Sequence, residues 1–266
     1  MNKLKINRHD KNLKIPSRII DMLNSADTEA GVFPPTILYN EGWMLRLVLS
    51  ACSEGISCLP FSFLSGSRWF SEALLYSPFL KRFPKDRLAE ACTHLDGAVG
   101  HFRFTPNTKT GLELLSDSKQ FITIEAKMYS PLSRGTKNAA FYDQAARTVA
   151  CMATTLERSH TSVKDFESIG FYIMAPEDQI RRGVFAKQIT RENIITNVLR
   201  RIEMYQKDKK YYPKLQSWFQ DRFDPLIKKI DLRCWSWETT LEKICAVKVE
   251  QGTLFKNFYK LCQKYN

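Results

Sequence analysis

The sequence predicts an α/β protein in which a mixed sheet packs between helices. Residues 121–129 alternate between two side-chain faces, as in a strand. An alanine-rich helix is expected over 139–157, and residues 169–176 form a second apolar strand. A strand, a helix and a strand at this spacing form a right-handed parallel crossover, which is typical of α/β sheets.

The strand at 121–129 places two ionisable groups side by side. Apolar side chains occupy one face, namely Ile122, Ile124, Ala126 and Met128. The opposite face carries Phe121, Thr123, Glu125, Lys127 and Tyr129. Glu125 and Lys127 are therefore neighbours in a segment otherwise fit for burial. A carboxylate and an ammonium are seldom buried without a partner or a function.

Asp96 offers a second carboxylate, in a strand that runs on from residue 97 to residue 104. A turn would bring it back beside Glu125, and two carboxylates about 4 Å apart repel by roughly 4 kcal/mol at an effective dielectric of 20. A cation is therefore expected between them. Lys127 is one candidate, and a divalent metal is the better one because Mg²⁺ prefers carboxylate oxygens.

Asp96 followed by Glu125-Ala126-Lys127 resembles the motif of the PD-(D/E)XK, or restriction-endonuclease-like, nuclease superfamily. The resemblance covers the middle of the chain and one helix upstream, with Leu95 where the motif has proline. It implies a core of helix, mixed β-sheet, helix and strand over residues 31–180. A basic segment, 1–30, precedes this core, and a mainly helical extension, 181–266, packs on it.

The same resemblance assigns roles to the motif residues. Asp96, Glu125 and the Ala126 carbonyl would hold one or two Mg²⁺ ions, and Mn²⁺ would also support activity. Lys127 would orient the attacking water and stabilise the charge that grows on the phosphate.

Two helical residues complete the expected site. Glu41 lies on an apolar helix over 37–49, for which Thr36 is a plausible N-cap, and would join the metal ligands. The alternative is a pair with Arg46 or another cation at the helix surface. Gln144, on the helix over 139–157 with Asn138 as its cap, would face the site and orient it; the alternative is a surface glutamine.

The remaining segments are expected to support this core. Residues 68–75 form either a first strand or part of a helix, and Glu90 would share a face with Asp96 if one strand joined them. Beyond residue 176 the sequence predicts helices over 190–206 and 215–230, a short strand at 232–237 and a helix ending near 247.

A nucleic acid is the expected partner because the chain carries a net charge of +12, from 40 Lys and Arg against 28 Asp and Glu. Some phosphate-binding candidates follow the strand at 121–129, and others lie in a run of basic and aromatic residues at 207–214. They are Arg134, Lys137, Arg147, Lys209 and Lys210. That run also suits a solvated loop between two helices. DNA is favoured over RNA, with a homodimer or accessory subunits as further partners.

Composition argues against a membrane or secreted protein. No apolar run approaches the roughly 20 residues of a membrane span, and the first residues lack the apolar core of a signal peptide. The 7 cysteines show no paired spacing, Cys52 and Cys58 being closest, so we expect mostly buried free thiols in a reducing cytoplasm.

These inferences favour a metal-dependent DNA endonuclease of a bacterial defence, mobile-element or repair system. One alternative is a catalytically silent nucleic-acid-binding or assembly module with the same fold. Another is a different enzyme, in which Glu125 and Lys127 form a structural ion pair inside the sheet.

Overall fold

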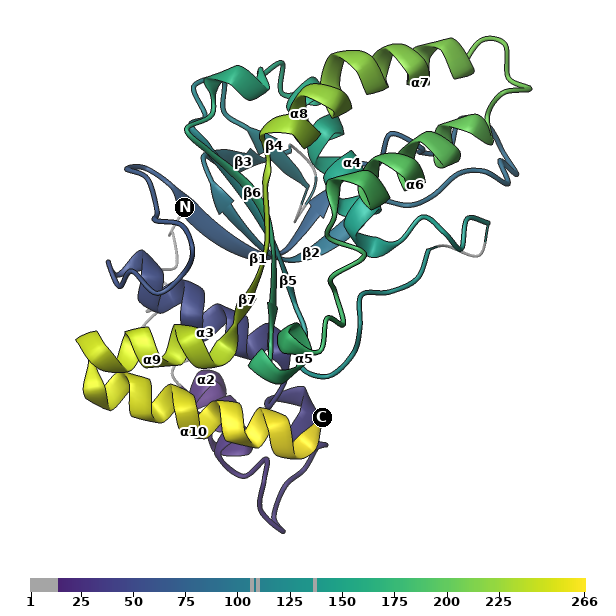
Figure 1. Ribbon diagram of the computed structural model, residues 1–266. Coiled ribbons are helices and arrows are strands. Elements are labelled where there is room, and N and C mark those ends of the chain that lie inside the picture. Colours follow the sequence, from purple (N-terminus) through teal and green to yellow (C-terminus); the bar gives the residue numbers. More distant parts are fainter. Residues whose placement is uncertain (1–13, 106–107, 109–110, 136–137) are drawn as a thin grey trace, which may run out of the picture.

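The computed structural model describes residues 14–105, 108, 111–135 and 138–266 (Figure 1). Its centre is a five-stranded sheet with the order β1-β2-β5-β6-β7. The strands are β1 (Arg68–Leu75), β2 (Thr93–Gly100), β5 (Gln120–Ala126), β6 (Ser168–Ala175) and β7 (Asp231–Ser236). A separate ladder pairs β3 (Phe102–Phe104) with β4 (Leu112–Leu114).

The sheet is mixed, which confirms the α/β class with a mixed sheet and helices that the sequence predicts. β1, β2 and β5 pair antiparallel, whereas β5, β6 and β7 pair parallel. Because β2 runs opposite to β5, the beginning of β2 lies beside the end of β5. Residues of these two ends can therefore meet at one edge of the sheet.

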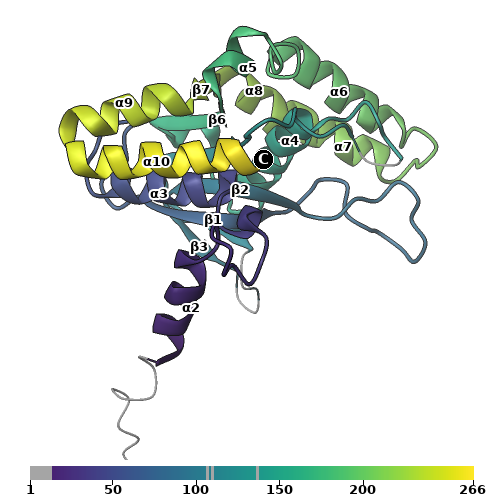
Figure 2. The same ribbon diagram turned by 90° about the horizontal axis from the view of Figure 1, so that it is seen from below.

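Helices cover both faces of the sheet (Figures 1 and 2). One face packs against α3 (Glu41–Ser53), α9 (Trp237–Val247) and α10 (Val249–Tyr265). The other packs against α4 (Gln144–Arg158), α6 (Arg191–Glu203), α7 (Tyr212–Trp218) and α8 (Asp224–Lys229). Shorter pieces are α5 (Glu177–Arg181), the 3₁₀ turns η1 (Pro35–Ile37) and η2 (Val163–Asp165) and the π-helical η3 (Phe219–Phe223).

The two faces of β5 divide as the alternation predicts. Ile122, Ile124 and Ala126 pack on the α3 side. Phe121 joins the α4 side, where Thr123 donates to the Met152 sulfur of α4 at 3.1 Å. Glu125 and Lys127 therefore point toward α4, whose alanines allow the helix to lie close to the sheet.

Two helices start later than the sequence predicts, because a nearer polar side chain caps each of them. Asn40, not Thr36, caps α3, accepting from the Trp43 amide at 3.0 Å. Asp143, not Asn138, caps α4, accepting from the Ala146 amide at 3.0 Å. Both side chains satisfy amides that the first helical turn leaves free.

The strand expected to run from residue 97 to 104 is interrupted at Gly100. This glycine has a φ of 150°, and a Cβ there would lie 2.1 Å from the Gln120 carbonyl oxygen. β2 therefore ends, and β3 pairs with β4 instead. The helix expected over 215–230 is likewise divided, by η3 between α7 and α8.

The C-terminal extension contributes to the central sheet, since β7 is its fifth strand. α10, which the sequence reading does not anticipate, packs against α9 and α3. At the other end of the chain, α2 (Lys14–Asn24) projects away from the body (Figure 2). None of the helices in the described ranges is long and apolar enough to cross a membrane.

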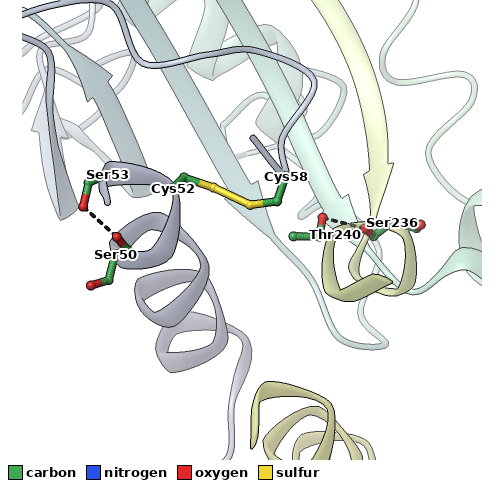
Figure 3. Close-up of a disulfide and its surroundings, with 6 residues drawn as sticks. All are labelled: Ser50, Cys52, Ser53, Cys58, Ser236 and Thr240. Atoms are coloured by element: carbon green, nitrogen blue, oxygen red, sulfur yellow. Dashed lines mark hydrogen bonds between the residues drawn. A yellow bond between two sulfur atoms is a disulfide. The ribbon is translucent and has the colours of Figure 1, made fainter. Parts of the chain in front are cut away.

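A disulfide joins Cys52, in the last turn of α3, to Cys58 in the loop that follows (Figure 3). This pairing corrects the interpretation that the cysteine spacing contains no pair, although Cys52 and Cys58 are the closest cysteines in the sequence. The five other cysteines are free, and only Cys151 and Cys262 of these are buried. The disulfide fastens the end of α3 to the loop that leads toward β1.

Candidate functional site

The strands β2 and β5 separate at Asp96. Their ladder runs from the pair Gly100–Phe121 to the pair Gly97–Ile124. Beyond it, the Ala126 amide donates to Asp96 Oδ2 at 2.7 Å, so a side-chain carboxylate takes the place of a backbone acceptor. The fork between the strands therefore holds the Asp96 carboxylate against the end of β5.

β1 is also distorted opposite Asp96. Ser71 pairs with Gly97 and Ala73 with Leu95, so Glu72 is left out of the register. Its φ of 58° is unusual for a residue with a side chain. Such irregularities change the direction of side chains within a sheet, and they often occur next to functional sites.

Glu125 lies at the end of β5 and is only 3% exposed. Its Oε1 accepts hydrogen bonds from Lys127 Nζ, at 2.8 Å, and from Gln144 Nε2. Its Oε2 is buried and receives no hydrogen bond from a donor among the described residues, and the Asp96 carboxyl group lies within hydrogen-bonding reach of the Glu125 side chain. A buried carboxylate oxygen without a donor is costly, which indicates that a cation or a proton belongs beside it.

The pKa of Glu125 is raised to about 8 by burial and by the neighbouring Asp96 carboxylate. Lys127 acts in the opposite direction, but its ion pair does not outweigh those two effects. In the absence of a metal, Glu125 therefore carries a proton at neutral pH. A carboxyl group whose pKa is raised by burial and by an adjacent carboxylate is a candidate for a functional site.

Gln144 is buried and contacts Glu125 directly, so the surface alternative is wrong. It is the first residue of α4, and Asp143 caps that helix. Its Oε1 accepts from the Ser133 amide at 2.9 Å while its Nε2 donates to Glu125. Gln144 thus links the loop after β5 to Glu125.

α6 supports this arrangement through Asp143. Asp143 Oδ2 accepts from Asn193 and Asn197 of α6, each at 3.1 Å. The start of α4, and with it Gln144, is therefore tied to the C-terminal extension. An aspartate directly before a helix is a local N-cap signal, whereas nothing local in the sequence indicates the contacts with the two asparagines of α6.

Lys127 is held through its side chain and its backbone. Its ammonium pairs with Glu125, and its amide donates to the Met174 carbonyl of β6 at 2.8 Å. Its own carbonyl accepts from the indole nitrogen of Trp237, the first residue of α9, at 2.9 Å. Nothing in the sequence pattern links Trp237 to the motif.

Glu41 is not gathered with the other two acids. It lies half-buried in the first turn of α3, near the Cys262 thiol. The pKa of that thiol is raised to about 12, mainly by burial and further by the charge of Glu41. Across the described ranges, no group of three or more His, Cys, Asp or Glu residues is placed to hold a metal. Arg46, the alternative partner of Glu41, instead contacts Ser71 and Glu72.

Glu90 is also separate from Asp96 in structure. β2 begins at Thr93, so no single strand joins the two acids. Glu90 is buried and accepts from the Ser77 hydroxyl, and burial raises its pKa.

Two of the expected phosphate-binding residues lie near the carboxylate pair. Arg134 is exposed in the loop after β5, one residue beyond Ser133. Arg147 follows Gln144 by one turn of α4, and its Nη2 lies 3.4 Å from the Ser133 hydroxyl. Lys137 lies outside the described residues.

The other two expected contacts are remote from this edge. Lys209 and Lys210 are exposed in the loop between α6 and α7. The first turn of α6 contacts Asp143 beside the site, so this loop lies at the opposite end of that helix (Figure 1). The structure therefore does not bring these lysines to the carboxylates.

The donor set fits a hard divalent cation. Asp96 supplies a carboxylate and Glu125 supplies an unpartnered oxygen. The backbone amide of Lys127 donates to β6. Since successive residues of a strand direct their backbone groups to opposite sides, the amide and carbonyl of Ala126 are directed toward β2. The Ala126 amide does donate to Asp96. The Ala126 carbonyl therefore faces the same fork, and three oxygens with added waters suit Mg²⁺ or Mn²⁺.

Comparison of the chain with protein-family models, with curated proteins and with solved structures finds no match.

Proposed function

We propose that this protein is a metal-dependent nuclease with a restriction-endonuclease-like core. The observation that carries the proposal is the Glu125 oxygen without a partner, buried beside Asp96 and on the same edge as the Lys127 ammonium. Two carboxylates and one lysine at the end of neighbouring strands suit hydrolysis of a phosphodiester. The chain's excess of basic residues supports a polyanionic substrate.

Each residue has a distinct role in this proposal. A divalent ion held by Asp96, Glu125 and the Ala126 carbonyl would supply a nucleophilic water at neutral pH. Gln144 occupies Oε1 of Glu125, so that Oε2 stays available. Lys127 neutralises charge that develops on the phosphate, and Arg134 and Arg147 hold the neighbouring backbone.

The proposed substrate is DNA in preference to RNA, cut at internal positions. A role in bacterial defence, mobile-element movement or repair suits such an activity. A second copy of the chain or an accessory subunit would allow both strands to be cut.

A silent module is the second candidate, and the ion pair between Lys127 and Glu125, at 2.8 Å, favours it. Such a pair can be purely structural inside a sheet. It leaves Glu125 Oε2 without a partner, however, and does not return the pKa of Glu125 to its usual range. A purely structural ion pair would satisfy both oxygens of Glu125 and keep its pKa in the usual range, so the nuclease is the better proposal.

A substrate panel separates the two candidates. Purified protein is incubated with supercoiled plasmid, single-stranded DNA or RNA, each with Mg²⁺, Mn²⁺ or EDTA, beside a Lys127→Ala variant. We expect cleavage that requires metal and falls by at least about 10²-fold in the variant, because charge on the phosphate is no longer neutralised. Binding of nucleic acid that is unchanged by EDTA, without cleavage on any substrate, would favour the silent module.

A further inference from the structure

The backbone of Lys127 has a hydrogen-bond partner from a distant part of the chain. Trp237 is fully buried, at 0% exposed, and its indole Nε1–H donates to the Lys127 carbonyl at 2.9 Å. Ser236 caps α9, accepting from the Thr239 amide at 3.1 Å, and ends β7 opposite Ala175. Sheet and cap together therefore fix the direction of the indole.

The need for this donor follows from the register of β5 and β6. Glu125 lies opposite Ile173, and the Lys127 amide donates to Met174. In a parallel ladder, the carbonyl of Lys127 would next accept from the amide two residues beyond Met174. That residue is Pro176, which has no amide hydrogen. β6 therefore cannot supply the bond, and the indole supplies it instead.

We propose that Trp237 is a positioning residue for Lys127, completing the β5 ladder with its indole where Pro176 cannot. The catalytic consequence of this inference rests on the proposed function, whereas the hydrogen bond between Trp237 and Lys127 does not depend on it. A buried carbonyl without a donor would reorient toward another partner. Because Lys127 and Glu125 are only two residues apart, rotation of that peptide would move the ammonium relative to the carboxylate.

Three variants isolate the donor. Trp237→Phe keeps an aromatic ring and removes the N–H group. Adding Pro176→Ala to it restores a backbone amide at the position where the ladder expects one. Trp218→Phe is the matched control, because Trp218 is also buried while its indole nitrogen has no partner among the described residues.

Two readouts are measured on each full-length variant: hydrogen exchange of the segment 121–129, and the kcat and KM of metal-dependent DNA cleavage. For Trp237→Phe we expect faster exchange and a kcat about tenfold lower with KM unchanged, since only geometry is altered. The added Pro176→Ala should restore most of both, and Trp218→Phe should match the wild type. In the wild type, the Trp237 indole proton should exchange far more slowly than that of Trp43, which is 40% exposed.

Exchange and kcat unchanged in Trp237→Phe would overturn the inference. A loss that Pro176→Ala does not restore would also overturn it, because packing rather than the donor would then be responsible. A fast-exchanging Trp237 indole would do so even if a variant failed to fold. Absence of wild-type cleavage would refute the proposed function alone, since hydrogen exchange would still report on the bond.

Discussion

Glu125→Gln is expected to reduce metal-dependent cleavage by about 10³-fold while the protein stays folded. Glutamine keeps the shape of the protonated side chain that the metal-free site holds at neutral pH, but it cannot become the anion that a divalent ion requires. Asp96→Ala should lose a comparable factor, because it removes the other carboxylate and the acceptor of the Ala126 amide. Initial rates of plasmid nicking, with circular dichroism to verify folding, measure both effects.

The control for this series is Glu113→Gln. Glu113 lies on β4 and forms an ion pair with Arg103 at 2.9 Å, away from the fork between β2 and β5. Its replacement changes the same atoms at a surface position and should leave the cleavage rate within about twofold. A Glu125→Gln enzyme that keeps more than a tenth of wild-type activity would show that Glu125 is no metal ligand.

The second large effect concerns stability against pH. Because the pKa of Glu125 rises from 4.5 to about 8 on folding, the folded state holds a proton that the unfolded state releases across this window. The free energy of unfolding of the metal-free protein should therefore fall as pH rises from about 4.5 to about 8. The contribution of Glu125 to this loss is at most about 5 kcal/mol.

Urea denaturation at a series of pH values, in EDTA, measures that loss. In Glu125→Gln the part of the slope due to Glu125 should disappear, since the amide does not titrate, and the slope that remains belongs to other buried groups such as Glu90, whose pKa burial also raises. Saturating Mn²⁺ should raise the stability of the wild type most at pH 8, because the ion replaces the proton. A wild-type profile that is flat, or that rises toward pH 8, would contradict the assigned protonation of Glu125.

The part of the site that the sequence predicts is the part encoded by local periodicity. Alternation in β5 placed Glu125 and Lys127 on one face, and the helix after the strand offered Gln144. The expectation of a cation between two carboxylates predicted that Asp96 lies beside Glu125, and Asp96 does lie at the end of β5. All four residues meet because β2 pairs antiparallel with β5 and α4 is the next helix after β5.

The rest of the site depends on tertiary contacts that no local pattern records. Trp237 reaches Lys127 across 110 positions of sequence, and only the register of β6 reveals that Pro176 leaves a bond to fill. The resemblance placed Glu41 at the metal site through the order of helices and strands. In the structure Asn40 caps α3, so Glu41 lies in the first turn of that helix. Lys209 and Lys210 have the expected charge, but the length of α6 separates them from the fork.

Metal binding by the isolated protein tests the central claim most directly, because it requires no knowledge of the substrate. Mn²⁺ is titrated into wild-type protein and into Glu125→Gln at pH 7 by calorimetry, in two buffers of different ionisation enthalpy. We expect saturable binding by the wild type with release of about one proton per chain as the Mn²⁺ site fills, and at least tenfold weaker binding by the variant. Equal binding by both proteins, or none by the wild type, would contradict a metal centre at Asp96 and Glu125.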